Sequence, residues 1–314
     1  MPIPTGTAAI SFSQLRTEMH TGLGNPAAYS SFPLNDGTFR SRLTDTAVNG
    51  ALSLSALRGN AYLRFTIAAN TTNYNIRTAF LGGYAAWPGA TKASADVVVN
   101  SGVVVGTAST GAYAMDTGGP WPAPSTIVVY NSGTVVGMGG AGGNGSPAGS
   151  PGSTTPGSAG GPALIAQRGM TLVNSGTVAG GGGGGGGGRG NVFSTPLGTP
   201  INAGGGGGGG GRTSNTPSAG GTGGSAGGAN PFPGNPGFAG TFAAAGAGRG
   251  SGGPAPGGGV GGTGGNWGTA GAASAGPAPT LPARAGGAAG ISVQGWSVVT
   301  APTGTTGISG PTAG

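Results

Sequence analysis

The first sixty residues carry two short helical patterns in an otherwise polar stretch. Phe12, Leu15 and Met19 recur at helical intervals, which predicts an amphipathic helix. Apolar positions over 52–57 predict a second helix that ends at a glycine. A segment this small cannot bury its own apolar stripe, so we expect residues 1–60 to dock either on the adjoining domain or on a partner protein.

Beyond the first sixty residues the pattern changes to alternation. Leu63, Phe65 and Ile67 alternate with polar positions, which predicts a strand with one buried face. Asn73 is then placed to cap a helical pattern over 74–81, which Gly82 and Gly83 would terminate. Together these signals predict a β-rich platform over 61–136 that contains one short helix.

One short pattern occurs three times, and in each copy an Asn-Ser-Gly turn separates two apolar, β-branched stretches. The copies span 98–104, 129–135 and 172–178. Asn and Gly tolerate the positive φ that a tight turn often needs, and β-branched residues favour a pleated surface. We therefore expect the three copies to pair or stack as short rungs.

The second and third copies lead directly into glycine-rich chain. The uninterrupted runs 180–188 and 204–211 belong to a chain with 79 Gly in 314 residues. Such a tract is normally a flexible linker. A flexible linker, however, does not need a repeated β-turn module at its entry. Extended helices with three residues per turn, which share backbone hydrogen bonds with one another, do need a platform to align them.

The expected fold is therefore a mainly β region with short helices, followed by a polyglycine II helix bundle, with little regular α-structure. Its expected divisions are an attachment segment over 1–60, the β-rich platform over 61–136 and a Gly-rich domain over 137–314.

The composition argues against disulfides, metal sites and cofactor binding. The chain has no cysteine, a single histidine (His20) and five acidic residues, none of which follows Asp116. We expect no disulfide, no metal site and no cofactor. The first residues lack the basic start and apolar core of a secretory signal, so we also expect a soluble protein that the Sec pathway does not export.

The net charge of +7 raises the question of nucleic-acid binding. The twelve basic residues are scattered, and Arg189, Arg212 and Arg249 each end a Gly-rich stretch instead of forming Arg-Gly-Gly repeats with interleaved aromatics. We expect no nucleic-acid partner. The basic excess is more typical of solubility and of weak attraction to anionic surfaces.

Catalytic patterns are absent as well. Asp96 and Asp116 are the only acids in the β region, His20 has no recognisable Ser or Asp partner, and no Gly-Lys-Ser/Thr follows the glycine runs. We expect the protein not to be an enzyme.

Short segments between the glycine stretches carry most of the larger side chains of the C-terminal half. If Gly-rich helices run up and down a bundle, these segments are its connecting loops, and such loops commonly carry function on a rigid scaffold. They could equally cap the bundle ends. The candidate binding residues are Phe193, Leu197, Phe232, Asn235, Phe238, Phe242 and Trp267, with Arg189, Arg212 and Arg249 beside them.

This arrangement resembles the Gly-rich distal adhesins of tailed bacteriophages, a family that includes tail-fibre tip proteins of T4-like phages. The resemblance rests on the stretch 10–18, on the Asn-Ser-Gly repeats that lead into 138–143, and on polyglycine separated by variable aromatic loops. It implies a virion protein, made in the host cytoplasm, with a polyglycine II domain. It also implies attachment to other tail or fibre proteins through the N-terminus, with Phe12, Leu15 and Met19 as candidates.

The same resemblance implies that the distal loops bind a bacterial surface receptor, either a protein or a glycan. It leaves the oligomeric state open, a homotrimer included, because fibres are commonly trimeric whereas polyglycine tips can be monomeric. We therefore expect a receptor-binding tail-fibre or tail-tip protein. The rival hypothesis is a purely structural cap or spacer whose glycine half only fills space.

Overall fold

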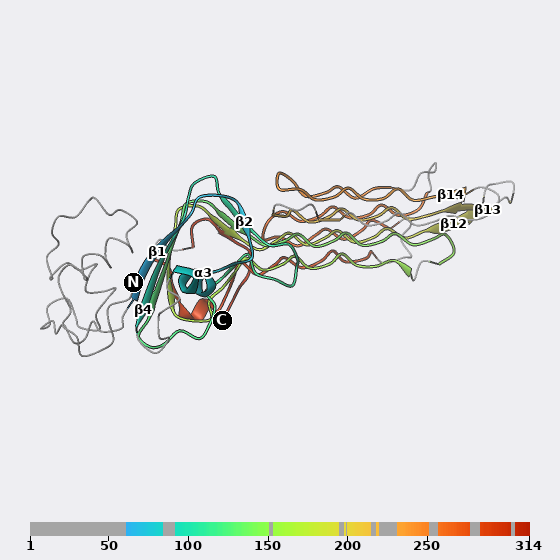
Figure 1. Cartoon of the computed structure of the whole chain (residues 1–314). Helices are drawn as coiled ribbons and strands as arrows, with labels where there is room; N and C mark the ends of the chain where they lie inside the picture. Colours follow the sequence, from blue (N-terminus) through green and yellow to red (C-terminus); the bar gives the residue numbers. More distant parts are fainter. Residues whose placement is uncertain are drawn as a thin grey trace, which may run out of the picture.

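The computed structural model describes residues 61–83, 92–150, 153–194, 198, 200–214, 218–219, 231–250, 257–276, 283–302 and 305–314. The expected attachment segment with Phe12, Leu15 and Met19 lies outside these residues, as does Leu197. Figure 1 shows two parts: a β-rich body that contains helix α3, and a long rod of extended segments that projects from it.

The body is a coil of parallel strands with three faces. In the part of the chain that the structure describes, each face is one parallel five-stranded sheet, and successive coils contribute one strand to each sheet. The first sheet contains β1 (Ala61–Ile67), β4 (Ala93–Val99), β7 (Thr126–Asn131), β10 (Met170–Asn174) and β16 (Val299–Thr300). The second contains β2 (Thr71–Thr72), β5 (Val104–Gly106), β8 (Thr134–Val136), β11 (Thr177–Ala179) and β17 (Ile308–Ser309). The third contains β3 (Tyr74–Asn75), β6 (Met115–Asp116), β9 (Leu164–Ile165), β15 (Val293–Gln294) and β18 (Thr312–Ala313).

The core fills the inside of this coil. The predicted alternation is confirmed in β1, where Ile67 is buried in the core and Leu63 and Phe65 pack against it. Its neighbour β4 buries Val97 and Val99 on the same side. Apolar residues of all three sheets thus share one core, whose burial is the main stabilising contribution to the body.

The predicted helix is confirmed as α3 (Ile76–Gly83), but its bounds are corrected: it begins two residues later than the pattern suggested, so Asn73 is not its cap, and it includes the two glycines that were expected to end it. Its first residues are preceded by β3, and Asn75 caps the helix because its side-chain oxygen accepts from the Thr78 amide at 2.8 Å. Phe80 is fully buried and meets the Trp121 ring edge-on at 5.3 Å. The helix therefore contributes to the core of the body.

The three Asn-Ser-Gly copies stack on one another, as predicted. Each ends a strand of the first sheet and begins a strand of the second, and the copies pair in parallel from coil to coil. Buried Asn131 donates to the side-chain oxygen of buried Asn174 at 2.7 Å. Of the three turn glycines, Gly102 alone has a positive φ. Gly133 and Gly176 are needed for another reason: a Cβ at either position would collide with backbone of the preceding copy.

The rod consists of two insertions at the same corner of the coil. Residues 137–163 connect β8 to β9, and residues 180–292 connect β11 to β15, whereas neighbouring coils turn this corner with only 107–114 or 310–311. The body is therefore not confined to 61–136, because the chain returns to it after each insertion. The expected division at residue 136 follows the sequence order but not the spatial parts.

The run Gly180–Gly188 lies at the centre of the rod, and all of its residues are buried. From Gly181 on, successive amides donate in turn to three different segments, and every third amide donates to the same segment again. The acceptors are Gly161, Ser158 and Thr155; Arg212, Gly209 and Gly206; and Thr269 and Ala272. Its carbonyls accept from three further segments with the same period, through Gly140, Gly143 and Ser146; Gly265 and Gly262; and Gly290 and Gly287.

The second run, 204–211, follows the same rule. Its amides donate in turn to the segment 232–238, to 140–146 and to 259–262, again with a period of three. A hypothetical Cβ at nearly every buried glycine of the two runs would overlap a carbonyl group of the adjacent segment. Backbone therefore packs directly on backbone, and no other residue fits.

A glycine in the centre of the rod and one in the helix provide a matched test. A Cβ on Gly184 would collide with the Ala141 carbonyl, whereas a Cβ on Gly82 has open space around it. Gly184→Ala is expected to lower the free energy of unfolding by about 3 kcal/mol or more, because backbone segments must separate. Gly82→Ala is expected to be neutral or to stabilise by up to about 1 kcal/mol, since Ala favours a helix. Denaturant unfolding of both variants measures the difference, and equal effects would contradict backbone-to-backbone packing.

Candidate functional site

The hydrogen bonds define the two ends of the rod. At the base, Gly180 donates to Ser309 of β17 at 3.3 Å and accepts from Gly268 at 2.8 Å. At the other end, Arg189 accepts from Gly259 at 2.6 Å. Figure 1 shows β12, β13 and β14 at this far end, which we call the tip.

The tip carries the only small sheet in the described part of the rod. Strands β12 (Asn191–Ser194) and β13 (Pro200–Ala203) form an antiparallel pair, and β14 (Pro231–Phe232) runs parallel to β13. Phe193 and Phe232 are half-buried, while Val192 is 47% exposed. The predicted residues Phe193 and Phe232 therefore lie close to the tip surface, with an exposed valine that the sequence interpretation missed.

The residues directly before β12 are fixed by buried hydrogen bonds. Ser146 is fully buried, and its hydroxyl accepts from the Gly190 amide at 2.8 Å. Arg189, the residue directly before Gly190, is only 9% exposed. The sequence placed this arginine on a loop border, and the structure places it inside the end of the rod.

Asn235, Phe238 and Arg249 lie along the flank of the rod between tip and base. The carbonyls of Asn235 and Phe238 accept from Gly207 and Gly210 of the second run. Phe238 is 49% exposed, and the Arg249 guanidinium carbon lies 4.0 Å from the centre of its ring. This cation–π pair is the most exposed aromatic feature among the predicted residues.

Trp267 lies at the base, against the body. It packs on a small apolar cluster formed by Val104, Val136 and Ala179, one residue each from β5, β8 and β11. Its indole nitrogen donates to the Thr213 carbonyl at 3.1 Å. The ring therefore connects the rod to the second sheet.

Two further predicted residues complete this basal joint. Phe242 meets the Trp267 ring edge-on at 5.0 Å, and the Arg212 guanidinium carbon lies 3.7 Å from the centre of the indole. Arg212 also donates to the Phe242 carbonyl at 2.9 Å. The expectation that Phe242, Trp267 and Arg212 belong to distal loops is therefore corrected, because the chain reverses at both ends of the rod and these residues lie at the reversals nearest the body.

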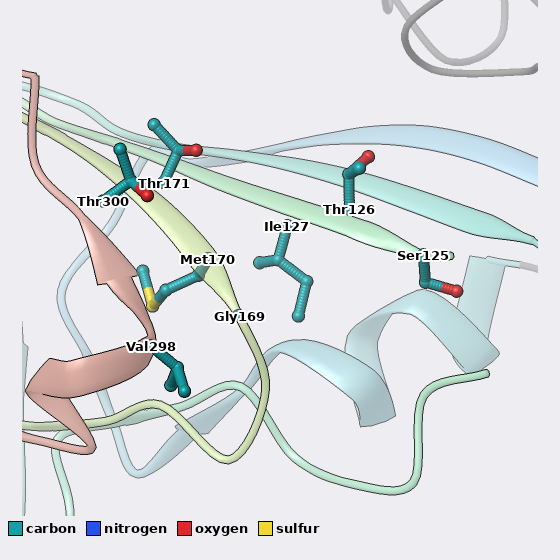
Figure 2. A pocket seen from close by; sticks show the side chains of 8 residues that line it. All are labelled: Ser125, Thr126, Ile127, Gly169, Met170, Thr171, Val298 and Thr300. Carbon is teal, nitrogen blue, oxygen red and sulfur yellow. The ribbon is translucent and has the colours of Figure 1, made fainter. Parts of the chain in front are cut away.

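A shallow hollow of about 170 Å³ lies on the first sheet of the body (Figure 2). It is lined by Ser125, Thr126, Ile127, Gly169, Met170, Thr171, Val298 and Thr300. None of these side chains is titratable, so the hollow lacks the groups that acid–base or metal chemistry needs.

The acids of the body take part in hydrogen bonds. Tyr62 donates to buried Asp96 at 3.1 Å, and Asp116 accepts from Gln167 at 2.9 Å and from the Gly118 amide at 2.7 Å. Burial also raises the pKa of the Tyr74 hydroxyl. Within the described ranges, no three His, Cys, Asp or Glu residues gather as metal ligands, and no helix is long and apolar enough to cross a membrane.

Comparison with protein families matches residues 63–312 to the phage tail fibre adhesin Gp38 family. The chain belongs to this family. It is therefore a receptor-binding adhesin of a phage tail fibre and a component of the virion, as the resemblance implied.

The chain is also similar to a solved structure, the gp37–gp38 adhesin tip complex of the long tail fibre of bacteriophage S16. The match has 22% sequence identity and a TM-score of 0.56, and it covers 95% of this chain and 96% of that one. At this identity the likeness shows a shared fold. Comparison with curated protein sequences found no match.

The basal and flanking aromatics provide a matched pair of variants. Trp267→Ala removes a ring that packs on three apolar residues, so we expect the free energy of unfolding to fall by about 3 kcal/mol. Phe238→Ala removes a ring that is half exposed, and we expect a change below about 0.5 kcal/mol. Denaturant unfolding followed by circular dichroism measures both, and a larger effect at Phe238 would contradict the placement of the joint.

Proposed function

We propose that this adhesin contacts its bacterial receptor with the tip of the rod. The observation that carries the proposal is the distribution of side chains. The rod is built from buried glycine backbone that offers almost no side-chain area, whereas the tip presents Val192, Phe193 and Phe232 on a small sheet. Aromatic side chains are frequent energetic anchors of interfaces because they bring large contact area at low entropy cost.

We further propose that the rod is a polyglycine II bundle. Its support is the period of three in the hydrogen bonds of both glycine runs, together with the six segments that surround 180–188. A left-handed helix with three residues per turn points successive peptide groups in three directions, which produces this pattern. The bundle acts as a stiff extension that holds the tip away from the body. The six segments that surround 180–188 belong to this same chain and complete its backbone hydrogen bonds, so we propose that one chain is sufficient to form the rod.

The flank pair Phe238 and Arg249 is proposed as a secondary contact. It lies beside the rod, and the positive charge of Arg249 favours an anionic bacterial surface, an attraction that salt weakens. The basal residues Phe242, Trp267 and Arg212 are proposed to hold the rod and not the receptor, because they pack on the body and on one another. We propose binding without catalysis, since none of these positions carries a nucleophile and base pair.

We propose that residues 1–60 attach the protein to another tail-fibre protein. Their apolar stripe of Phe12, Leu15 and Met19 needs a surface to cover it. The similar S16 protein was solved as a complex of two tail-fibre proteins, gp37 and gp38, which supports a partner of this class.

The tip is tested by exchanging its hairpin, residues 192–201, for a Gly/Ser segment of equal length. We expect phage particles to assemble normally and to adsorb at least tenfold more slowly, because the main contact area is removed. Phe238→Ala, which changes only the flank, serves as the control and is expected to slow adsorption much less. Unchanged adsorption of the exchanged particles would favour the rival hypothesis of a structural spacer.

Attachment is tested by deleting residues 1–60 from the adhesin gene. The truncated protein is expected to remain soluble but to be missing from purified particles, as judged by mass spectrometry of the virion. Triple substitution of Phe12, Leu15 and Met19 by Ser is expected to reproduce this loss. Normal incorporation of the truncated chain would show that the attachment surface lies in the body.

A further inference from the structure

Arg189 stands apart from the other arginines of the rod. Within the described residues, Arg212 and Arg249 stack on aromatic rings, and Arg284 donates to the Thr154 hydroxyl at 3.0 Å. Arg189 has no such contact there: its Nε is buried without an acceptor, and the residue as a whole is only 9% exposed. Its other two guanidinium nitrogens are not among the buried atoms without a partner.

The chain supplies no acid to neutralise this charge from the C-terminal side. Residues 117–314 contain no Asp or Glu. Asp116 lies in β6 of the body, at the opposite end of the rod, and already accepts from Gln167 and Gly118. The run between base and tip spans roughly 25 Å at the rise of an extended three-residue helix. Burial of a guanidinium without a counter-charge is unfavourable, and an unsatisfied buried group of this kind calls for an external partner.

The backbone on both sides of Arg189 is fixed. Its carbonyl accepts from Gly259 at 2.6 Å, and the next amide, that of Gly190, donates to buried Ser146 at 2.8 Å. The backbone that carries this side chain is therefore set in place, directly before strand β12 of the tip. A guanidinium that is held in place loses little entropy when it binds an oxyanion, and its planar fork matches phosphate and carboxylate groups.

We propose that Arg189 forms an anion-binding subsite in the tip, which takes a phosphate or carboxylate group of the bacterial surface. This inference rests on the proposal that the tip contacts the host. It specifies the chemistry of one group on the host: an oxyanion, which supplies the negative charge that the rod does not provide for Arg189. Glycan phosphates, lipid phosphates and acidic sugars share this chemistry.

The first test uses purified full-length protein and its melting temperature. Sodium phosphate, compared with sodium chloride at equal ionic strength, is expected to raise the melting temperature of the wild type in a saturable way. Arg189→Met is expected to remove this shift and also to melt higher than wild type in chloride, because it removes an unpaired buried charge. Arg64→Gln, which removes an exposed arginine of β1 in the body, is expected to keep the phosphate shift. Sodium acetate in place of phosphate distinguishes a carboxylate preference from a phosphate preference.

The second test measures phage adsorption, and its first comparison needs only wild-type particles. Added phosphate at constant ionic strength is expected to slow adsorption of wild-type particles several-fold, and Arg189→Met particles are expected to adsorb at least tenfold more slowly than wild type. Adsorption to cells with dephosphorylated surface glycan separates a phosphate source from an acidic sugar.

The proposal is overturned if Arg189→Met keeps the phosphate shift, or if phosphate leaves wild-type adsorption unchanged. A variant that melts lower and adsorbs normally would show a purely structural arginine. If the hairpin exchange impairs adsorption while Arg189→Met does not, the tip remains the receptor-binding surface and only the anion subsite is wrong. If neither change impairs adsorption, both proposals fail.

Discussion

The rod depends on one constraint: backbone N–H and C=O groups buried away from water must be hydrogen-bonded, and a glycine run has no side chains to help. The structure meets this constraint by surrounding Gly180–Gly188 with six other segments, three that accept and three that donate. Each neighbour is then close enough that a Cβ would collide with it. Glycine is therefore required at these positions by contact, although it is the residue that loses most conformational entropy when it becomes ordered.

The body supplies the alignment that such a bundle needs. Stacked Asn-Ser-Gly turns bring β8 and β11 side by side in parallel, so the two insertions leave the same corner in the same direction. The joint of Trp267 on the second sheet then ties a later part of the rod to that corner. The body thus aligns the rod at its base, and the small sheet β12–β14 lies at the other end.

The sequence predicted the local elements well, because their signals are local. The alternation in β1, the helix α3 and the stacking of the three repeated turns follow from side-chain periodicity and turn chemistry. It did not predict which loops lie at which end. Phe242 and Trp267 occur in Gly-rich surroundings that look the same as those of Phe193, yet the first two lie at the base because the chain reverses there. The return of β15–β18 to the body was also missed, since two-residue strands carry no period.

The central claim is that glycine backbone, hydrogen-bonded segment to segment, is the ordered scaffold of this adhesin. Amide hydrogen exchange of the intact protein, resolved to the peptides that contain 180–188 and 204–211, measures it directly. The account predicts slow exchange throughout both runs, comparable with the strands β4 and β7 of the body. Exchange of both runs at the rate of an unstructured glycine peptide, with the body still protected, would contradict it.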